Sequence, residues 1–318
     1  MPGGFTHFAV VRQLGINKTL MSIKGMTREI ADALLLYSNY LELGAVSPDL
    51  PYFSPFSKNS ADWGNALHHE RTVETVRVGV NKLSALNPGG KEHKKATTWL
   101  FGYASHVVAD MISHPVVNKK IGLYESHKPQ HRVCELNQDT YIFQKYFRDE
   151  IAGRNGCEYL DQGVKTCTKD GRSGTKLAPF LTDFWVAILK DVYPDKKDSN
   201  PASWFRRFVI LIDKVAEEGH RFVSFSRSRM EKEGYAYQDK PDMTYVTDLL
   251  SPYGGQISLD NLFARFQEET KIIWGQMSRA VTANDARLIT LRNGDLDTGI
   301  DLADNKTSVF WNKERGLA

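Results

Sequence analysis

Three side chains able to bind a metal ion recur at intervals of four in one stretch of the sequence. The stretch reads His106-Val-Val-Ala-Asp110-Met-Ile-Ser-His114. In a helix this spacing places the three side chains on one face, with a drift of about 40° per step. The residues between them are apolar or small, so this face does not belong to an ordinary polar surface. Because a buried charge needs a partner, the pattern favours metal binding over three unrelated structural residues.

Other segments supply the same kinds of side chain, most of them in the first half of the chain. His131 and Glu135 repeat the four-residue spacing, which taken alone fits an exposed pair. Asp49 lies in a stiff loop between two prolines, where an aspartate can also simply shape a turn. The remaining candidates are His7, His68 and His69.

Together the candidates offer imidazole and carboxylate groups but no thiolate. Such donors favour a catalytic zinc, manganese or iron ion over a structural zinc site built from cysteines. Up to eight ligands exceed the needs of one four-coordinate ion, so we expect two or three ions with a bridging carboxylate. Clusters of this kind bind the attacking and the leaving oxygens of a phosphodiester. The motifs of competing chemistries are absent from the sequence: Gly-x-Ser-x-Gly, the P-loop, Gly-x-Gly-x-x-Gly, Cys-x-x-Cys and His-Glu-x-x-His.

Helical periodicity dominates the chain and predicts an all-α fold that positions these side chains. The expected helices span residues 28–43, 61–83, 92–113, 129–152, 178–192, 201–231 and 258–282. Thr27 is the expected N-cap of the first helix and Gly44 its end, while Pro115 is expected to stop the third. Short β-like pieces are expected around residues 288–291 and 308–311, which makes the C-terminal part small and irregular or β-containing. No alternation of strands and helices supports a doubly wound sheet.

Composition and charge restrict the class of protein further. The chain has 318 residues, of which 41% are hydrophobic and 25% charged, as in a soluble globular protein. No uncharged apolar stretch is long enough for a transmembrane segment, and a net charge of +3 does not by itself indicate a nucleic-acid surface. We expect a metal-site part over residues 1–152, a Gly-rich loop insertion over 153–176, and a remainder over 177–318 packed into the same domain. Without a recognisable signal peptide, the protein is expected to be cytoplasmic or exported by another route.

The ordered set of motifs resembles the zinc-dependent phospholipase C family. This superfamily also includes single-strand-specific nucleases and the N-terminal domain of a glycosylphosphatidylinositol-specific phospholipase D. The resemblance runs from about Thr6 to Asp139, and Asp139 matches a later acidic residue that continues the last motif. It implies a multi-helix domain of the phospholipase C and nuclease type, with three zinc ions in a cleft.

The resemblance also implies which residues bind each ion. One zinc would be held by His68, His106, Asp49 and Asp110, with His68 preferred over His69. A second zinc would be held by His114, His131 and Glu135. His7 would share the third with Asp110, which then acts as the bridge.

From these residues we expect a phospholipase C that cleaves glycerophospholipids through a zinc-activated hydroxide. Asp49 would orient the attacking water and accept its proton. An aromatic pocket for the head group would be lined by Tyr52, Phe53, Phe56 and Trp63.

The partners expected with this reading are a phosphodiester substrate and a peripheral membrane contact. Nuclease-type and phospholipase D-type cleavage are the alternatives, and only the former implies nucleic acid as a partner. An alternative of another class is a catalytically idle interaction protein in which the metal stabilises the helices.

Overall fold

Helices account for almost all regular structure in the computed structural model, which describes residues 3–54, 57–147, 162–218 and 239–311. In this described part the one sheet pairs strand β1 (Leu249–Leu250) with strand β2 (Gln256–Ile257) in antiparallel register. The prediction of an all-α fold is therefore confirmed. None of the helices described is both long enough and apolar enough to cross a membrane.

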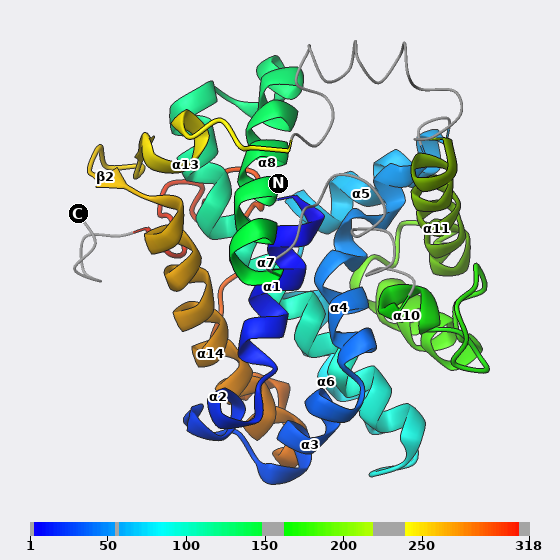
Figure 1. Ribbon diagram of the computed structural model, residues 1–318. Coiled ribbons are helices and arrows are strands. Elements are labelled where there is room, and N and C mark those ends of the chain that lie inside the picture. Colours follow the sequence, from blue (N-terminus) through cyan, green and yellow to red (C-terminus); the bar gives the residue numbers. More distant parts are fainter. Residues whose placement is uncertain (1–2, 55–56, 148–161, 219–238, 312–318) are drawn as a thin grey trace.

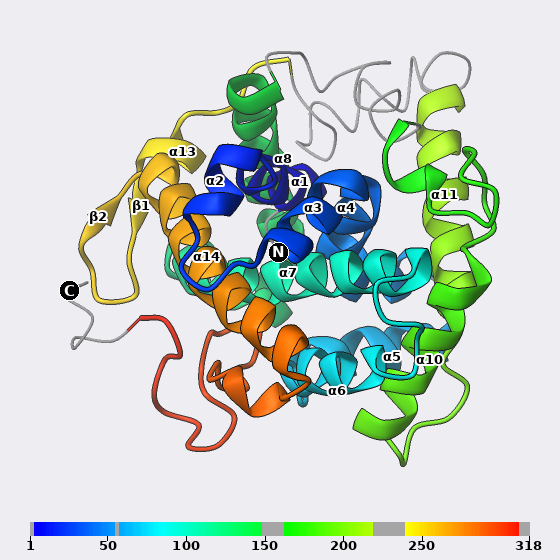
Figure 2. The same cartoon turned by 90° about the horizontal axis from the view of Figure 1, so that it is seen from below.

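The long helix α7 (Lys91–Ile121) forms the centre of the molecule (Figures 1 and 2). It is buried on all sides from Ala96 to Val117, as expected for a helix packed within a core. The helices packed around it are α1 (Gly4–Leu14), α3 (Arg28–Leu36), α4 (Ser38–Val46), α6 (Glu74–Leu83), α8 (Tyr124–Phe147), α10 (Pro179–Val192) and α14 (Leu259–Ala283).

Shorter or more peripheral elements complete the described structure. The other α-helices are α2 (Asn17–Ser22), α5 (Lys58–His69), α11 (Pro201–Glu218) and α13 (Thr244–Thr247). The 3-10 helices are η1 (Ser47–Phe53), η2 (Val164–Thr166) and η3 (Ala286–Leu288).

Gly44 does not end a helix, contrary to the prediction from the sequence. The expected helix over residues 28–43 is interrupted at Tyr37, and its second part, α4, continues to Val46. Gly44 lies where α4 crosses α7, and a Cβ atom at this position would lie 2.0 Å from the carbonyl oxygen of Trp99. On the facing helix, a Cβ on Gly102 would lie 2.0 Å from the Leu41 oxygen. The two glycines therefore allow backbone contact between the helices.

Pro115 also fails to end its helix, because α7 continues to Ile121. Proline has no N–H group, so the carbonyl of Met111 loses its usual partner within the helix. The C-terminal segment packs on this point of the helix. A Cβ on Gly299 would lie 2.5 Å from the Met111 oxygen, and the indole of Trp311 donates a hydrogen bond of 2.9 Å to the carbonyl of Ile112.

The other predictions from the sequence were confirmed in part. The Thr27 N-cap and the helices expected over 178–192 and 258–282 are confirmed, with ends within a residue of those predicted. The helix expected over 61–83 is divided into α5 and α6 by a turn in which Arg71 has a φ of 49°. Residues 288–291 form no strand, whereas Ser308 makes one isolated bridge to Ile300. The expected helix ends at 152 and 231, and residues 153–161 of the Gly-rich insertion, lie outside the described residues.

Candidate metal centre

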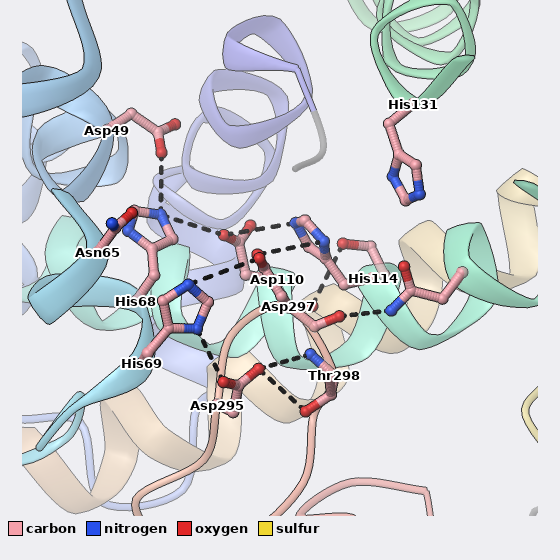
Figure 3. A network of polar contacts seen from close by, with 12 residues as sticks. Asp49, Asn65, His68, His69, Asp110, His114, His131, Asp295, Asp297 and Thr298 are labelled. Carbon is pink, nitrogen blue, oxygen red and sulfur yellow. Dashed lines mark hydrogen bonds and ion pairs between the residues drawn. The ribbon is translucent and has the colours of Figure 1, made fainter. Parts of the chain in front are cut away.

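Four helical elements bring imidazole and carboxylate groups to one buried region beside the middle of α7. Figure 3 shows Asp49, His68, Asp110 and His114 among them. Helix α7 itself provides a row of three residues at the predicted spacing of four. The contributed residues are His7 from α1, Asp49 from η1, His68 from α5, and His106, Asp110 and His114 from α7.

Four of these side chains lie within a few ångströms of their neighbours. The Nε2 atom of His68 lies 3.1 Å from Oδ1 of Asp49 and 3.9 Å from Oδ2 of Asp110. The Nε2 atom of His106 lies 3.7 Å and 3.2 Å from the same two oxygens. Ligands of a tetrahedral zinc ion, each about 2.0–2.1 Å from the metal, are separated by about 3.4 Å. The ligand atoms of His68, His106 and Asp110 all lie within 4.8 Å of one another, and so do those of His7, Asp49 and His106. The donors therefore form two overlapping trios with separations that suit a metal ion.

The carboxylate of Asp110 faces two groups of donors with its two oxygens. Its Oδ2 atom faces His68 and His106, whereas its Oδ1 atom lies 3.2 Å from Nε2 of His7. The ring of His7 stacks on the ring of His106 with 4.2 Å between centroids. This division of its oxygens suits Asp110 to bridging two ions.

Main-chain carbonyls orient two of the imidazoles. The Nδ1 atom of His68 lies 2.8 Å from the carbonyl oxygen of Gly64, and Nδ1 of His106 lies 2.9 Å from that of Ala45. In a neutral ring whose Nδ1–H donates to the carbonyl, Nε2 carries no proton and faces the centre. Outer contacts of this kind hold the ring and tautomer of histidine ligands to metals.

Many polar atoms at this point are buried and have no hydrogen-bond partner. They are both nitrogens of His7 and of His114, Nε2 of His106, Nδ1 of His131, and both oxygens of Asp110. Each such atom costs about 1–3 kcal/mol if it stays unsatisfied. Lone pairs on nitrogen and oxygen that converge without partners are satisfied by a cation, so the residues present fit a zinc ion.

The charges at the centre depend on one another. Burial acts to raise the pKa of Asp110, but the charge and close approach of His106 and the contact with His7 hold it well below its usual value. Burial also acts to raise the pKa of Asp49, but His106 and His68 outweigh it and lower the pKa. For His106, burial lowers the pKa, but the two carboxylates outweigh it and raise the pKa to about 9.

The trio expected to hold a second ion is less tightly grouped. Nε2 of His114 lies 3.8 Å from Oδ2 of Asp110, and His131 projects from α8 on the same side (Figure 3). Nε2 of His131 lies 2.7 Å from the carbonyl oxygen of Gly122. Glu135 is buried, which raises its pKa, and lies 3.7 Å from a guanidinium nitrogen of Arg132. The ligand atoms of this trio do not all lie within 4.8 Å of one another.

Asp139 contacts the helix that carries His7. Its carboxylate accepts hydrogen bonds from the main-chain N–H groups of Phe5 and Thr6 and from the Thr6 hydroxyl, at 3.2, 2.8 and 2.6 Å. These contacts provide an acceptor for donors in the first turn of α1. Asp139, which lies eight residues after His131 on α8, therefore fixes the start of α1.

The aromatic residues expected to line a substrate pocket lie in different surroundings. The ring of Tyr52 lies beside His68, with 5.1 Å between centroids. Phe53 packs on Phe208 of α11. Trp63 is 2% exposed, and its indole donates a hydrogen bond to the Lys197 carbonyl. The expected role of Phe56 concerns a position outside the described residues.

Two acidic residues near the centre were missed by sequence reasoning. Asp295 and Asp297 belong to the C-terminal segment, within Asn-Gly-Asp-Leu-Asp-Thr-Gly. Nδ1 of His69 lies 2.8 Å from Oδ2 of Asp295, and its Nε2 lies 3.7 Å from Oδ2 of Asp297. Oδ1 of Asp297 lies 3.7 Å from Nδ1 of His114 (Figure 3). The sequence signal for this site was two closely spaced aspartates between glycines. The local sequence does not indicate that they contact histidines far away in the chain.

Comparison with known proteins identifies one family. The sequence profile described as zinc-dependent phospholipase C matches residues 6–195, more than half of the chain. The match contains every predicted zinc ligand and ends well before Asp297. No curated protein and no solved structure matches the chain.

Proposed function

The chain belongs to the zinc-dependent phospholipase C family, and from this premise we propose that it hydrolyses glycerophospholipids by C-type cleavage with two or three zinc ions. The observation that carries the proposal is the buried group of imidazole and carboxylate atoms, many of them without a hydrogen-bond partner, whose separations suit a metal ion. A structural zinc site is usually closed and rich in thiolates, whereas this donor set contains none.

The ligands divide into three groups in this proposal. The first ion is bound by His68, His106, Asp49 and Asp110. The second is bound by His114, His131 and Glu135, which requires their side chains to move closer together on binding. The third is bound by His7, with Asp110 as the bridge, and the approach of its Oδ1 atom to His7 supports this division.

Zinc held here would supply Lewis acidity, activating water as the nucleophile and stabilising charge on the phosphoryl and leaving oxygens. Asp49 is the proposed general base. Its Oδ1 atom faces His68 and His106, so Oδ2 is the atom assigned to accept the proton of the attacking water. The Asp49 side chain is 9% exposed, whereas Asp110 is 0% exposed. The greater exposure of Asp49 favours it over Asp110 as the group that meets water and substrate.

A panel of substrates tests the proposed reaction. The protein is loaded with zinc and incubated, with and without a chelator, with phosphatidylcholine and anionic phospholipids in mixed micelles, single-stranded DNA and a chromogenic phosphodiester. We expect diacylglycerol and a phosphorylated head group, formed only without chelator. Release of phosphatidic acid would indicate D-type cleavage instead, and oligonucleotides would indicate a nuclease. A zinc-loaded protein inactive on every substrate would favour the idle interaction protein.

Substitution of Asp49 tests the assignment of the base. Asp49→Asn should lower kcat by about 100-fold or more while changing KM little, because general-base catalysis typically contributes 10²–10⁴-fold. Asp62→Asn is the matched control, since Asp62 is an exposed residue of α5. Turnover of Asp49→Asn close to that of the wild type, at full zinc content, would exclude this role.

A further inference from the structure

Three histidines at the centre share a pattern that His114 lacks. His68, His106 and His131 each place one ring nitrogen 2.7–2.9 Å from a main-chain carbonyl oxygen. The other nitrogen of His106 and of His131 has no hydrogen-bond partner, and that of His68 lies 3.1 Å from Oδ1 of Asp49. No hydrogen-bond partner is found for either nitrogen of His114, although the residue is fully buried.

The two nitrogens of His114 face different carboxylates. Its Nε2 lies 3.8 Å from Oδ2 of Asp110, on the side where Nε2 of His106 also faces Asp110. Its Nδ1 faces away from this point, 3.7 Å from Oδ1 of Asp297. A neutral imidazole that binds a metal through one nitrogen carries a proton on the other. If Nε2 faces the metal, Nδ1–H is therefore a buried donor, and Asp297 is the acceptor beside it.

Asp297 is held in place by contacts on both sides of its segment. The N–H of Leu296 donates to the carbonyl of His68 at 2.8 Å, and the amide of Asn118 donates to the main-chain oxygen of Asp297 at 2.6 Å. The second carboxylate oxygen of Asp297 lies 3.7 Å from Nε2 of His69. Asp295 in turn lies 2.8 Å from the other nitrogen of that ring. These contacts fix the carboxylate beside α7.

We propose that Asp297 is a positioning residue for the second metal position. Its carboxylate accepts a hydrogen bond from Nδ1–H of His114 and thereby directs Nε2 toward the ion. The inference rests on the proposed function and adds a residue from outside the family match of 6–195. The separation of 3.7 Å is longer than a hydrogen bond, so the two groups must approach by almost 1 Å when the ion binds. A carboxylate acceptor also makes the imidazole a more basic ligand.

Zinc titration of Asp297→Asn tests the inference directly. Zinc affinities are measured by competition with a chromophoric chelator for the wild type, Asp297→Asn and the control Asp304→Asn, whose residue is exposed on the same segment. We expect one zinc equivalent of Asp297→Asn to bind about 10- to 100-fold more weakly, with the others unchanged. The control should bind like the wild type.

The outcomes separate this inference from the proposed function. Equal zinc affinities in the wild type and Asp297→Asn would overturn the role of Asp297 alone. A wild-type protein that binds no zinc would overturn the proposed function, and this inference with it.

A measurement on the unaltered protein covers the case in which Asp297→Asn does not fold. In ¹⁵N-histidine spectra of the zinc-loaded wild type, His114 should carry its proton on Nδ1 and have Nε2 bound to the metal. That proton should exchange slowly and resonate downfield because it is buried and bonded to a carboxylate. A ring of His114 protonated on Nε2 and bound to metal through Nδ1 would overturn the assignment.

Discussion

Gly44→Ala perturbs the helix crossing that holds the centre together. The added Cβ would lie 2.0 Å from the Trp99 carbonyl oxygen and 2.8 Å from the Tyr103 nitrogen. Both atoms belong to the backbone of α7, so the strain cannot be relieved by turning a side chain. Ordinary contact of a Cβ atom begins at 3.4 Å, so α4 must move from α7 by more than 1 Å.

The magnitude follows from three contributions. Overpacking typically costs about 1–3 kcal/mol. The shift also displaces the adjacent Ala45 carbonyl from Nδ1 of His106, a hydrogen bond worth about 1 kcal/mol. Alanine stabilises a helix by about 1 kcal/mol relative to glycine, which offsets part of this loss. We therefore expect Gly44→Ala to lose about 1–3 kcal/mol of unfolding free energy. Loss of the outer partner of His106 should also weaken zinc binding about 10- to 100-fold.

Urea unfolding of the metal-free protein and zinc competition titrations measure the two effects separately. Gly4→Ala is the matched control, because a Cβ on this residue of α1 meets only a side-chain carbon of Val46 at 4.0 Å. That variant should be at least as stable as the wild type, because alanine favours the helix and meets no clash, and it should bind zinc equally well. If Gly44→Ala matched Gly4→Ala in both measurements, the backbone contact between α4 and α7 would not control the geometry of the centre.

Three further predictions concern the metal, the helix start and pH. Removing zinc should lower the melting temperature, because zinc at about 1,000 times its Kd adds about 4 kcal/mol to the free energy of unfolding. Equal melting temperatures with and without chelator would contradict this. Asp139→Ala should lower the unfolding free energy by about 2 kcal/mol in urea titrations, because it removes the acceptor at the start of α1. Asp139→Asn keeps an acceptor oxygen and should lose less. The pKa of about 9 for His106 means that at pH 7 zinc must displace a proton. Zinc binding should therefore release about one proton, and affinity should rise with pH from 7 to 9, by up to about tenfold per unit. Calorimetry in two buffers with different ionisation enthalpies counts that proton, and zero release would refute the assignment.

The central helix and its row of ligands could be predicted because both depend on local periodicity. A spacing of four puts His106, Asp110 and His114 on one face of any helix that contains them. The apolar residues between them indicated that the face is buried, and all three side chains are 0% exposed. Local sequence was sufficient here because the helix itself determines the relative positions of the three residues.

Tertiary contacts account for the predictions that failed. Glycine and proline are local stop signals, but Gly44 serves a helix crossing and Pro115 lies where the C-terminal segment packs on α7. Asp297 could not be placed from sequence because its neighbours His69 and His114 are far away in the chain. A contact across such a separation leaves no periodic trace in the sequence.

The packing of the C-terminal segment on α7 has a consequence for synthesis of the protein. Asp297 follows His131 by more than 160 residues. At about 5–20 residues per second, roughly 10–30 s separate their emergence from the ribosome. During this interval the nascent chain already contains every predicted zinc ligand, but His68 and Asn118 still lack their contacts with residues 296 and 297. The segment thus completes the surroundings of the centre last, after a period in which zinc can reach a more open set of ligands.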